Sequence, residues 1–464
     1  MSKASSAGRH PRDDGRLRDL LASERFDRRE MLPPLLGATI LFLLGSLGHY
    51  LPGIGLSAFD PIALSAFALL AVAGGLVALA MTLGGRIGQA LLMGLLAYLV
   101  AELHVPMADP LAVAPLGVAL GLWKPRTLAR LLGVIFAVVL VGSLFAARVE
   151  PHDNPPPGAS GDPALPALLH VIVDEIGPEP VLPPARFSQW TGAHSRYHVT
   201  KASLPDMTDR FYAILLDRGY DLEIWRSDYV RSCPDGARCA RHRNFHAAAI
   251  RDTGLPLVRQ VEILLYGWLR TGQTLENVVA QIDPMIGASH VSTLTSLDVL
   301  QRVDERAATL GPGEALSVHV LLPHYPYALA PDCTLKPFAQ WVGRSPAFPV
   351  DDRRTAYADQ LACLAERLAD IGHDDMVIVV HGDHGTRYFD MKMTDSERRE
   401  VVMHQAFATQ FALHLPGAAP RTVDRPASVG SLLEELAASD FTSLPVGREQ
   451  SVFTGEGPFR EVER

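Results

Sequence analysis

Hydrophobic and polar positions divide this chain into two regions of different character. Residues 1–30 are crowded with charge, whereas the sequence from Met31 to about Ala147 is nearly free of charged side chains. After Glu150, polar and apolar residues mix as in an ordinary soluble domain. A helix needs about 20 apolar residues to cross a bilayer. The pattern therefore predicts a membrane-spanning region followed by a soluble domain.

The apolar region contains a series of candidate membrane spans. They lie near 33–50, 61–84, 88–104, 110–123 and 129–147. The fourth is short and contains Pro115, so three to five spans fit the sequence.

The basic residues between these spans predict the orientation. Arg86 lies in the loop near 84–87, and three basic residues lie in the loop at 124–130, whereas the loops at 51–60 and 105–109 have none. Basic loops stay in the cytoplasm. This alternation favours five spans, with the amino terminus inside and the soluble domain outside.

The expected organisation has four parts. We expect a cytoplasmic tail at 1–30, transmembrane helices at 31–148, a linker rich in proline and glycine at 149–165, and an extracytoplasmic domain at 166–464. The net charge of -9 makes the chain a poor nucleic-acid binder, and no basic stripe argues otherwise, so we expect no nucleic-acid partner.

The four cysteines all fall in the soluble part. Outside the cytoplasm an even number of cysteines permits disulfides, and we expect the pairs Cys233–Cys239 and Cys333–Cys363. Free buried thiols are the alternative.

Strands and helices alternate along the soluble part. This order predicts an α/β fold in which a mainly parallel sheet lies between helices. The expected strands are Leu168–Val173, Asp221–Trp225, Ser317–Leu322, Val377–Val380 and Phe407–Leu415. The expected helices lie around 208–217, 256–280, 293–309 and 357–371.

Three of these strands end in polar clusters. Asp174 and Glu175 follow the first, His324 follows the third, and Asp383 and His384 follow the fourth. The carboxyl ends of parallel strands meet at one edge of a sheet, so these side chains are expected to share a crevice. Carboxylate and imidazole groups are natural ligands of a divalent metal. Taken singly, each cluster also fits an ordinary polar turn.

The motifs resemble those of the alkaline phosphatase superfamily, and within it the membrane-anchored sulfatase-like proteins, such as lipoteichoic acid synthases and phosphoethanolamine transferases. The matching segments are Val171-Ile-Val-Asp-Glu, Thr200-Lys-Ala-Ser-Leu-Pro, Gly219-Tyr-Asp-Leu, Leu321-Leu-Pro-His-Tyr-Pro-Tyr and Val380-His-Gly-Asp-His-Gly. They run in the order that the family has, over nearly all of residues 166–417.

The resemblance implies a metal site made of Asp174 or Glu175, with Glu175 slightly favoured, together with Asp383 and His384. The expected cofactor is a divalent ion, with Zn, Mn and Ca all compatible. His381 and His404 are weaker candidates for the same surroundings, as is Arg387 for an anionic substrate.

The resemblance also implies a nucleophile. Thr200 matches best and Ser203 is the alternative, while a helix N-cap is the structural role open to Thr200. Sulfatases that form formylglycine need Cys or Ser, then x-Pro-x-Arg, but Met207 stands where the arginine belongs. This departure favours direct attack by Thr200. His324 is expected to stabilise the oxyanion or assist the leaving group, or else is held in a proline-rich turn.

The resulting hypothesis is a metal-dependent hydrolase or transferase acting on phosphate or sulfate esters at the bacterial cytoplasmic membrane. Its partners would be the lipid bilayer and an envelope lipid or glycan ester. The segment after Thr200 is shorter than in the family, since residues 207–210 run almost directly into a helix. A catalytically impaired binding or scaffolding domain is therefore the alternative.

Overall fold

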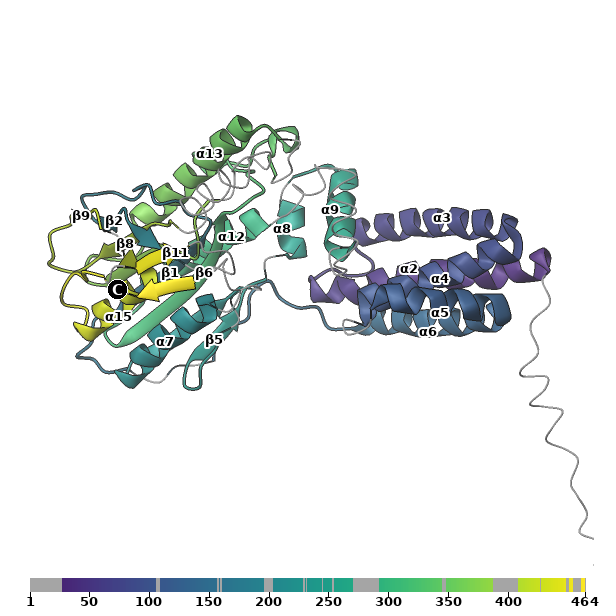
Figure 1. Ribbon diagram of the computed structural model, residues 1–464, viewed down its shortest axis with the longest axis horizontal. Coiled ribbons are helices and arrows are strands. Elements are labelled where there is room, and N and C mark those ends of the chain that lie inside the picture. Colours follow the sequence, from purple (N-terminus) through teal and green to yellow (C-terminus); the bar gives the residue numbers. More distant parts are fainter. Residues whose placement is uncertain are drawn as a thin grey trace, which may run out of the picture. The chain divides into compact units, whose positions relative to one another are not determined.

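A computed structural model gives the structure of the chain (Figure 1). It describes residues 27–463 except 106–108, 157, 159–160, 196–202, 228–229, 231, 244, 253, 270–291, 344–347, 387–407, 426, 448–449 and 454–459. The chain separates into two compact units, which are described one at a time. The first is built mainly from residues up to Arg148 and the second mainly from Val149 onward.

The first unit is a bundle of apolar helices. Its described helices are α2 (Arg28–Gly53), α3 (Pro61–Leu83), α4 (Gly85–His104), α5 (Pro110–Trp123) and α6 (Pro125–Phe145). Aspartates at 60 and 109 cap α3 and α5, each accepting a hydrogen bond at 2.9 Å from the backbone two residues later. These helices coincide with the five expected spans.

Four of these helices are long and apolar enough to cross a membrane, namely α2, α3, α4 and α6. Helix α5 has 14 residues, which gives a length of about 21 Å, short of the ~30 Å hydrocarbon core. It packs closely on α4, because glycines at 94, 117 and 121 bring the two backbones together.

The second unit is an α/β domain around an eight-stranded sheet. The strand order is β5-β4-β6-β1-β7-β8-β2-β9. The strands from β5 to β7 are parallel, whereas β8 is antiparallel to both of its neighbours. The expected fold class, a mainly parallel sheet between helices, is confirmed.

Five strands of this sheet, β1, β4, β6, β7 and β8, overlap the expected positions, whereas β2, β5 and β9 were not predicted. The strands of the sheet are β1 (Leu168–Asp174), β2 (Ser188–Trp190), β4 (Asp221–Arg226), β5 (Arg238–Arg241), β6 (Glu314–Pro323), β7 (Val377–Gly382), β8 (Phe411–His414) and β9 (Thr422–Val423). Two smaller sheets pair β3 (Ala193–His194) with β10 (Ala427–Ser428), and β11 (Gln450–Phe453) with β12 (Arg460–Glu463).

The remaining described helices follow in chain order. They are α7 (Ser203–Asp217), α8 (Ala247–Asp252), α9 (Leu257–Leu269), α12 (Ser292–Ala307), a 3₁₀ turn at Phe338–Gln340, α13 (Val350–Ala369) and α15 (Val429–Ala438).

Each face of the large sheet has its own hydrophobic core. Helices α12 and α13 pack on one face, against Leu169, Val171 and Val173 of β1. Helices α7 and α15 pack on the other face, against Leu168 of the same strand. Alternate residues of a strand point to opposite faces. His170 and Asp174 therefore belong to the face covered by α7.

Part of the expected linker is bound to the second unit. The backbone N–H groups of Asp153 and Arg243 donate to the carbonyls of Arg241 and Pro151, at 2.9 and 3.0 Å. His152 also forms an isolated bridge with His242. The segment at 151–153 thus continues the sheet edge after β5.

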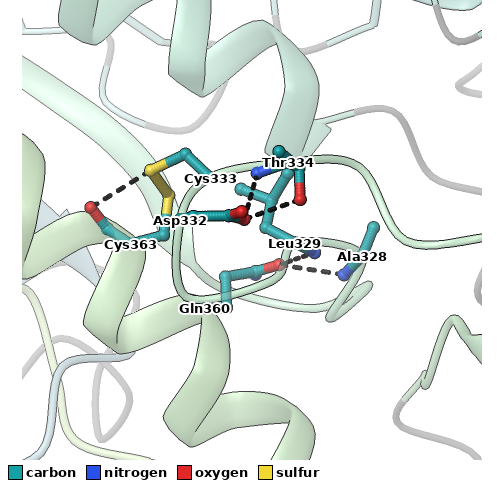
Figure 2. Close-up of a disulfide and its surroundings, with 7 residues drawn as sticks. All are labelled: Ala328, Leu329, Asp332, Cys333, Thr334, Gln360 and Cys363. Carbon is teal, nitrogen blue, oxygen red and sulfur yellow. Dashed lines mark hydrogen bonds between the residues drawn. A yellow bond between two sulfur atoms is a disulfide. The ribbon is translucent and has the colours of Figure 1, made fainter.

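Both expected disulfides are present. Cys233 joins Cys239, and Cys333 joins Cys363. In Figure 2 the second bond ties the loop after β6 to helix α13. Nearby, Gln360 of α13 accepts hydrogen bonds from the backbones of Ala328 and Leu329, at 2.9 and 3.3 Å.

Candidate metal centre

Asp174, Asp383 and His384 come together where two neighbouring strands end. Strand β1 ends at Asp174, and the parallel strand β7 ends just before Asp383. His384 Nε2 lies 3.0 Å from Asp174 Oδ1 and 3.6 Å from Asp383 Oδ1. All three side chains are buried. The structure thus brings these three predicted residues together at the edge where β1 and β7 end.

Glu175 lies in the same corner. Its side chain is fully buried, and its backbone N–H donates to Asp383 Oδ1 at 3.3 Å. Its φ of 66° is in the left-handed region, which a residue with a side chain adopts at a cost. Strain of this kind gathers at functional sites, because the surrounding structure holds the residue there.

His319 is a further member of the site that the sequence analysis missed. It lies within β6, and its Nε2 is 3.8 Å from Asp383 Oδ2. Single donor atoms of Asp174, His319 and Asp383 lie within 4.8 Å of one another, close enough to hold one metal ion. His319 stands two positions after Ser317 on strand β6, which is buried from Ala315 onward. This period-two pattern of polar residues was the available signal.

His324 lies at the carboxyl end of β6 but turns toward its own loop. Its ring Nδ1 is 2.6 Å from the carbonyl oxygen of Tyr325, and its own carbonyl accepts a hydrogen bond from Gln360 Nε2 at 2.9 Å. Since β6 and β1 pair, His324 belongs to the same edge as Asp174.

Several other predicted residues cannot be placed. Thr200, Arg387 and His404 lie outside the described residues. Ser203 is the first residue of α7, although its side chain is also outside them. Helix α7 covers the face of the sheet that carries the metal-site residues.

The donor atoms fit a cation. His384 Nδ1 donates to the carbonyl of Gly385 at 2.6 Å, so in the neutral ring Nε2 carries a lone pair that faces Asp174. His319 Nε2 and Asp383 Oδ2 are buried and have no hydrogen-bond partner among the described residues. A positive ion between these atoms would satisfy all of them.

Neighbouring side chains hold His319 in place. Ser227, at the end of β4, lies with its Oγ 2.7 Å from His319 Nδ1. Such a contact fixes the ring of a metal-binding histidine and leaves Nε2 for the metal. His242 is buried nearby, and burial, followed by the charges of His319 and His152, lowers its pKa to about 3. His242 is therefore neutral at physiological pH.

A buried chain of hydrogen bonds runs beneath the site. His381 Nδ1 donates to the carbonyl of Gly382 at 2.9 Å, and burial lowers the pKa of His381 to about 4. The neutral ring therefore accepts at Nε2 from His170 Nε2, 2.8 Å away. His170 in turn accepts at Nδ1 from Ser317 at 2.9 Å, and Ser317 accepts from the Tyr212 hydroxyl at 2.8 Å.

The hydrogen bonds of this buried chain all run in one direction, from the Tyr212 hydroxyl to the carbonyl of Gly382. Burial, followed by the charge of His381, lowers the pKa of His170 well below its ordinary value, so both rings stay neutral. The hydrogen-bonded side chains join α7, β6, β1 and β7. The last of them, His381, lies two residues before Asp383. His381 was a weak candidate for the site, and the structure gives it this supporting position.

Comparison with known proteins finds no matching family model and no matching curated protein. Solved structures are similar in part. A protein of the alkaline phosphatase superfamily from Vibrio parahaemolyticus has 14% identity and a TM-score of 0.37, covering 67% of this chain and 78% of that one.

Two further similar structures are a lipoteichoic acid synthase from Listeria monocytogenes and a phosphonate monoester hydrolase from Agrobacterium radiobacter. Their identities are 10% and 12%, with TM-scores of 0.33 and 0.32. Each match covers 60% of this chain, and 72% and 74% of the other chains.

Proposed function

We propose that this chain is a metal-dependent hydrolase or transferase that acts on phosphate or sulfate esters. The observation that carries the proposal is the buried group of Asp174, His319, Asp383 and His384 at adjacent strands. Within this group, His319 Nε2 and Asp383 Oδ2 are buried without a hydrogen-bond partner among the described residues, and a cation between them would satisfy both. The carboxyl edge of a parallel sheet is also where α/β proteins bind their ligands.

The proposed metal ligands are Asp383, His384 and His319, with Asp174 or Glu175 completing the set. Imidazole and carboxylate donors together favour Zn or Mn over Ca. A bound divalent ion would favour the deprotonated form of an attacking hydroxyl and stabilise negative charge on the ester.

Thr200 is the proposed nucleophile. Its hydroxyl first loses its proton to solvent, then Oγ1 attacks the phosphorus or sulfur of the ester, and the bond to the leaving alcohol breaks. We assign to His324 the role of giving that alcohol its proton. Water or an acceptor hydroxyl then takes the group from Thr200, which regenerates the hydroxyl. Water as acceptor gives a hydrolase, and an envelope lipid or glycan gives a transferase.

The proposed location is the cytoplasmic membrane of a bacterium, with residues 166–464 on the outer side. Basic residues at the α3–α4 connection and at the α5–α6 connection, including the first turns of α4 and α6, support this orientation, with residues 1–30 as a cytoplasmic tail and 149–165 as the linker. Both disulfides belong to the proposed outer part, which fits an oxidising compartment.

The metal content of the full chain, purified in detergent, tests the proposal. We expect close to one divalent ion per chain by mass spectrometry, and its loss when Asp383→Ala and His384→Ala are combined. Hydrolysis of p-nitrophenyl phosphate, phosphonate and sulfate esters then identifies the chemistry. Thr200→Ala should lower the rate by at least about a thousandfold, whereas Ser203→Ala, its near neighbour, should retain it.

Other outcomes would change the conclusion. Wild-type protein that stays metal-free after Zn, Mn and Ca are each added would favour the scaffolding alternative. A metal-loaded protein in which Ser203→Ala is inactive and Thr200→Ala is active would move the nucleophile to Ser203.

A further inference from the structure

Arg353 is a buried cation that forms no ion pair with the residues that the structure describes. Arg353 lies in the first turn of α13 and is only 4% exposed. Its Nε has no hydrogen-bond partner in the part of the chain that the structure describes. The next residue, Arg354, has a side chain that is 54% exposed and pairs with Asp351. Burying an unpaired guanidinium is costly, so the structure tolerates Arg353 for some other gain.

The face of α13 that carries Arg353 packs on the end of β1. Tyr357, one turn along the same face, donates from its hydroxyl to the carbonyl of Glu175 at 2.9 Å and accepts from Gly177 N–H at 3.1 Å. Residues four apart on a helix are neighbours on its surface. Arg353 is therefore placed beside the strand end that carries Asp174 and Glu175.

Tyr327 brings Arg353 and Glu175 into one environment. Its ring packs edge-on against that of Tyr357, with centroids 5.8 Å apart. Burial, and then the charge of Glu175, raise the pKa of Tyr327, whereas the charge of Arg353 lowers it. Glu175 and Arg353 thus both lie within electrostatic range of the Tyr327 hydroxyl.

The loop that brings Tyr327 to this place is firmly held. Gln360 of α13 donates from Nε2 to the carbonyls of Pro323 and His324, at 3.1 and 2.9 Å. Its Oε1 binds the other end of the loop, and the Cys333–Cys363 disulfide closes it, as Figure 2 shows. A binding group on such a fixed frame is preorganised.

Aromatic stacking does not account for Arg353. Among the described residues, the arginines that lie over aromatic rings are Arg186, Arg259 and Arg302. Arg353 is not among them, although Tyr357, one turn along α13, packs against Tyr327.

We propose that Arg353 forms an oxyanion subsite next to the metal centre, with the Tyr327 hydroxyl as a neighbouring donor. The subsite takes a tetrahedral phosphate or sulfate group, which a guanidinium binds through two parallel hydrogen bonds. In the enzyme this group is either the free anion released by the reaction or a second anionic group of the ester. The enzymatic part of this inference rests on the proposed function, and the binding of the anion does not.

Binding of inorganic phosphate to the full chain in detergent, with EDTA present, tests the subsite without the metal. Titration calorimetry on the wild type should give saturable binding. Arg353→Met, which keeps the length and removes the charge, should weaken binding about 10- to 100-fold. Arg354→Met is the matched control and should bind as the wild type does.

The melting temperature without anion shows whether the Arg353→Met variant is folded like the wild type. Because Arg353→Met removes an unpaired buried charge, the variant should melt at or above the wild-type temperature. Equal phosphate affinity in Arg353→Met and the wild type would overturn the subsite. A much lower melting temperature would overturn it as well, since Arg353 would then have a structural partner.

Methyl phosphate distinguishes the two sources of the anion. Binding at least as tight as that of inorganic phosphate supports an ester-borne group, and binding of inorganic phosphate alone supports the released product. If the protein binds no metal but Arg353-dependent phosphate binding remains, the proposed ester chemistry fails while the subsite stands.

Discussion

His319 and Asp383 face each other across strand β1, with His319 Nε2 3.8 Å from Asp383 Oδ2. They belong to β6 and β7, which both pair with β1, so that Ile172 lies level with His319 on one side and with His381 on the other. Side chains at the same level of a parallel sheet share a face. His319 therefore reaches the metal centre from within a strand, whereas Asp383 reaches it from beyond a strand end.

This geometry predicts that His319 is a metal ligand. His319→Gln should lower the affinity for the metal by at least about tenfold, because Nε2 is the donor atom that faces Asp383. The measurement is a zinc titration of metal-stripped protein against a chelating dye. His373→Gln, in a loop of the same domain, should leave the affinity unchanged. Unaltered affinity in His319→Gln would remove His319 from the ligand set.

The sequence was sufficient to predict the residues at strand ends but not those within strands. Asp174, Asp383 and His384 follow apolar runs, so a sheet of parallel strands places them together. His319 and His170 lie inside such runs and looked like buried strand residues. Only the pairing of β6, β1 and β7 reveals that their faces coincide.

The buried arginine was beyond sequence reasoning for a different reason. Arg353 and Arg354 are adjacent and chemically identical, and the sequence offers no means to say which is buried. Which of the two is buried depends on the face that α13 turns toward the 323–329 loop, and tertiary packing sets that orientation. By contrast, the disulfides were predictable, because one pair is close in sequence and leaves only the other.

Gln360 should be critical for the stability of the soluble unit. Its amide makes four hydrogen bonds to backbone groups of the 323–329 loop. Gln360→Ala leaves these buried groups unsatisfied, and we expect the free energy of unfolding to fall by about 2–5 kcal/mol. Urea denaturation of the full chain measures the loss. Gln301→Ala, an exposed glutamine of α12, should change it by less than about 0.5 kcal/mol.

The two disulfides should differ in their contribution to stability. Cys333 and Cys363 are 30 residues apart, whereas Cys233 and Cys239 are 6 apart. Loop-closure entropy then assigns about 3.6 kcal/mol to the first bond and about 2.2 kcal/mol to the second. Replacing each pair by serines and comparing urea midpoints tests this order. A larger loss from the shorter loop would show that local packing outweighs chain entropy.

Stability should fall as the pH drops below about 6.5, and His170 should contribute to the fall. Burial, followed by the charge of His381, holds the pKa of His170 well below its ordinary value of 6.5 in the folded chain. Below that pH the unfolded chain takes up a proton that the folded chain cannot, so stability is lost as the pH falls toward the folded pKa. Each such histidine costs about 1.4 kcal/mol per pH unit, or roughly 2 °C in melting temperature for a domain of this size. Melting curves between pH 7.5 and 5 should therefore be less steep in pH for His170→Gln than for the wild type. Equal slopes would mean that His170 accepts a proton inside the fold, and the one-way hydrogen-bond chain from Tyr212 to Gly382 would be wrong.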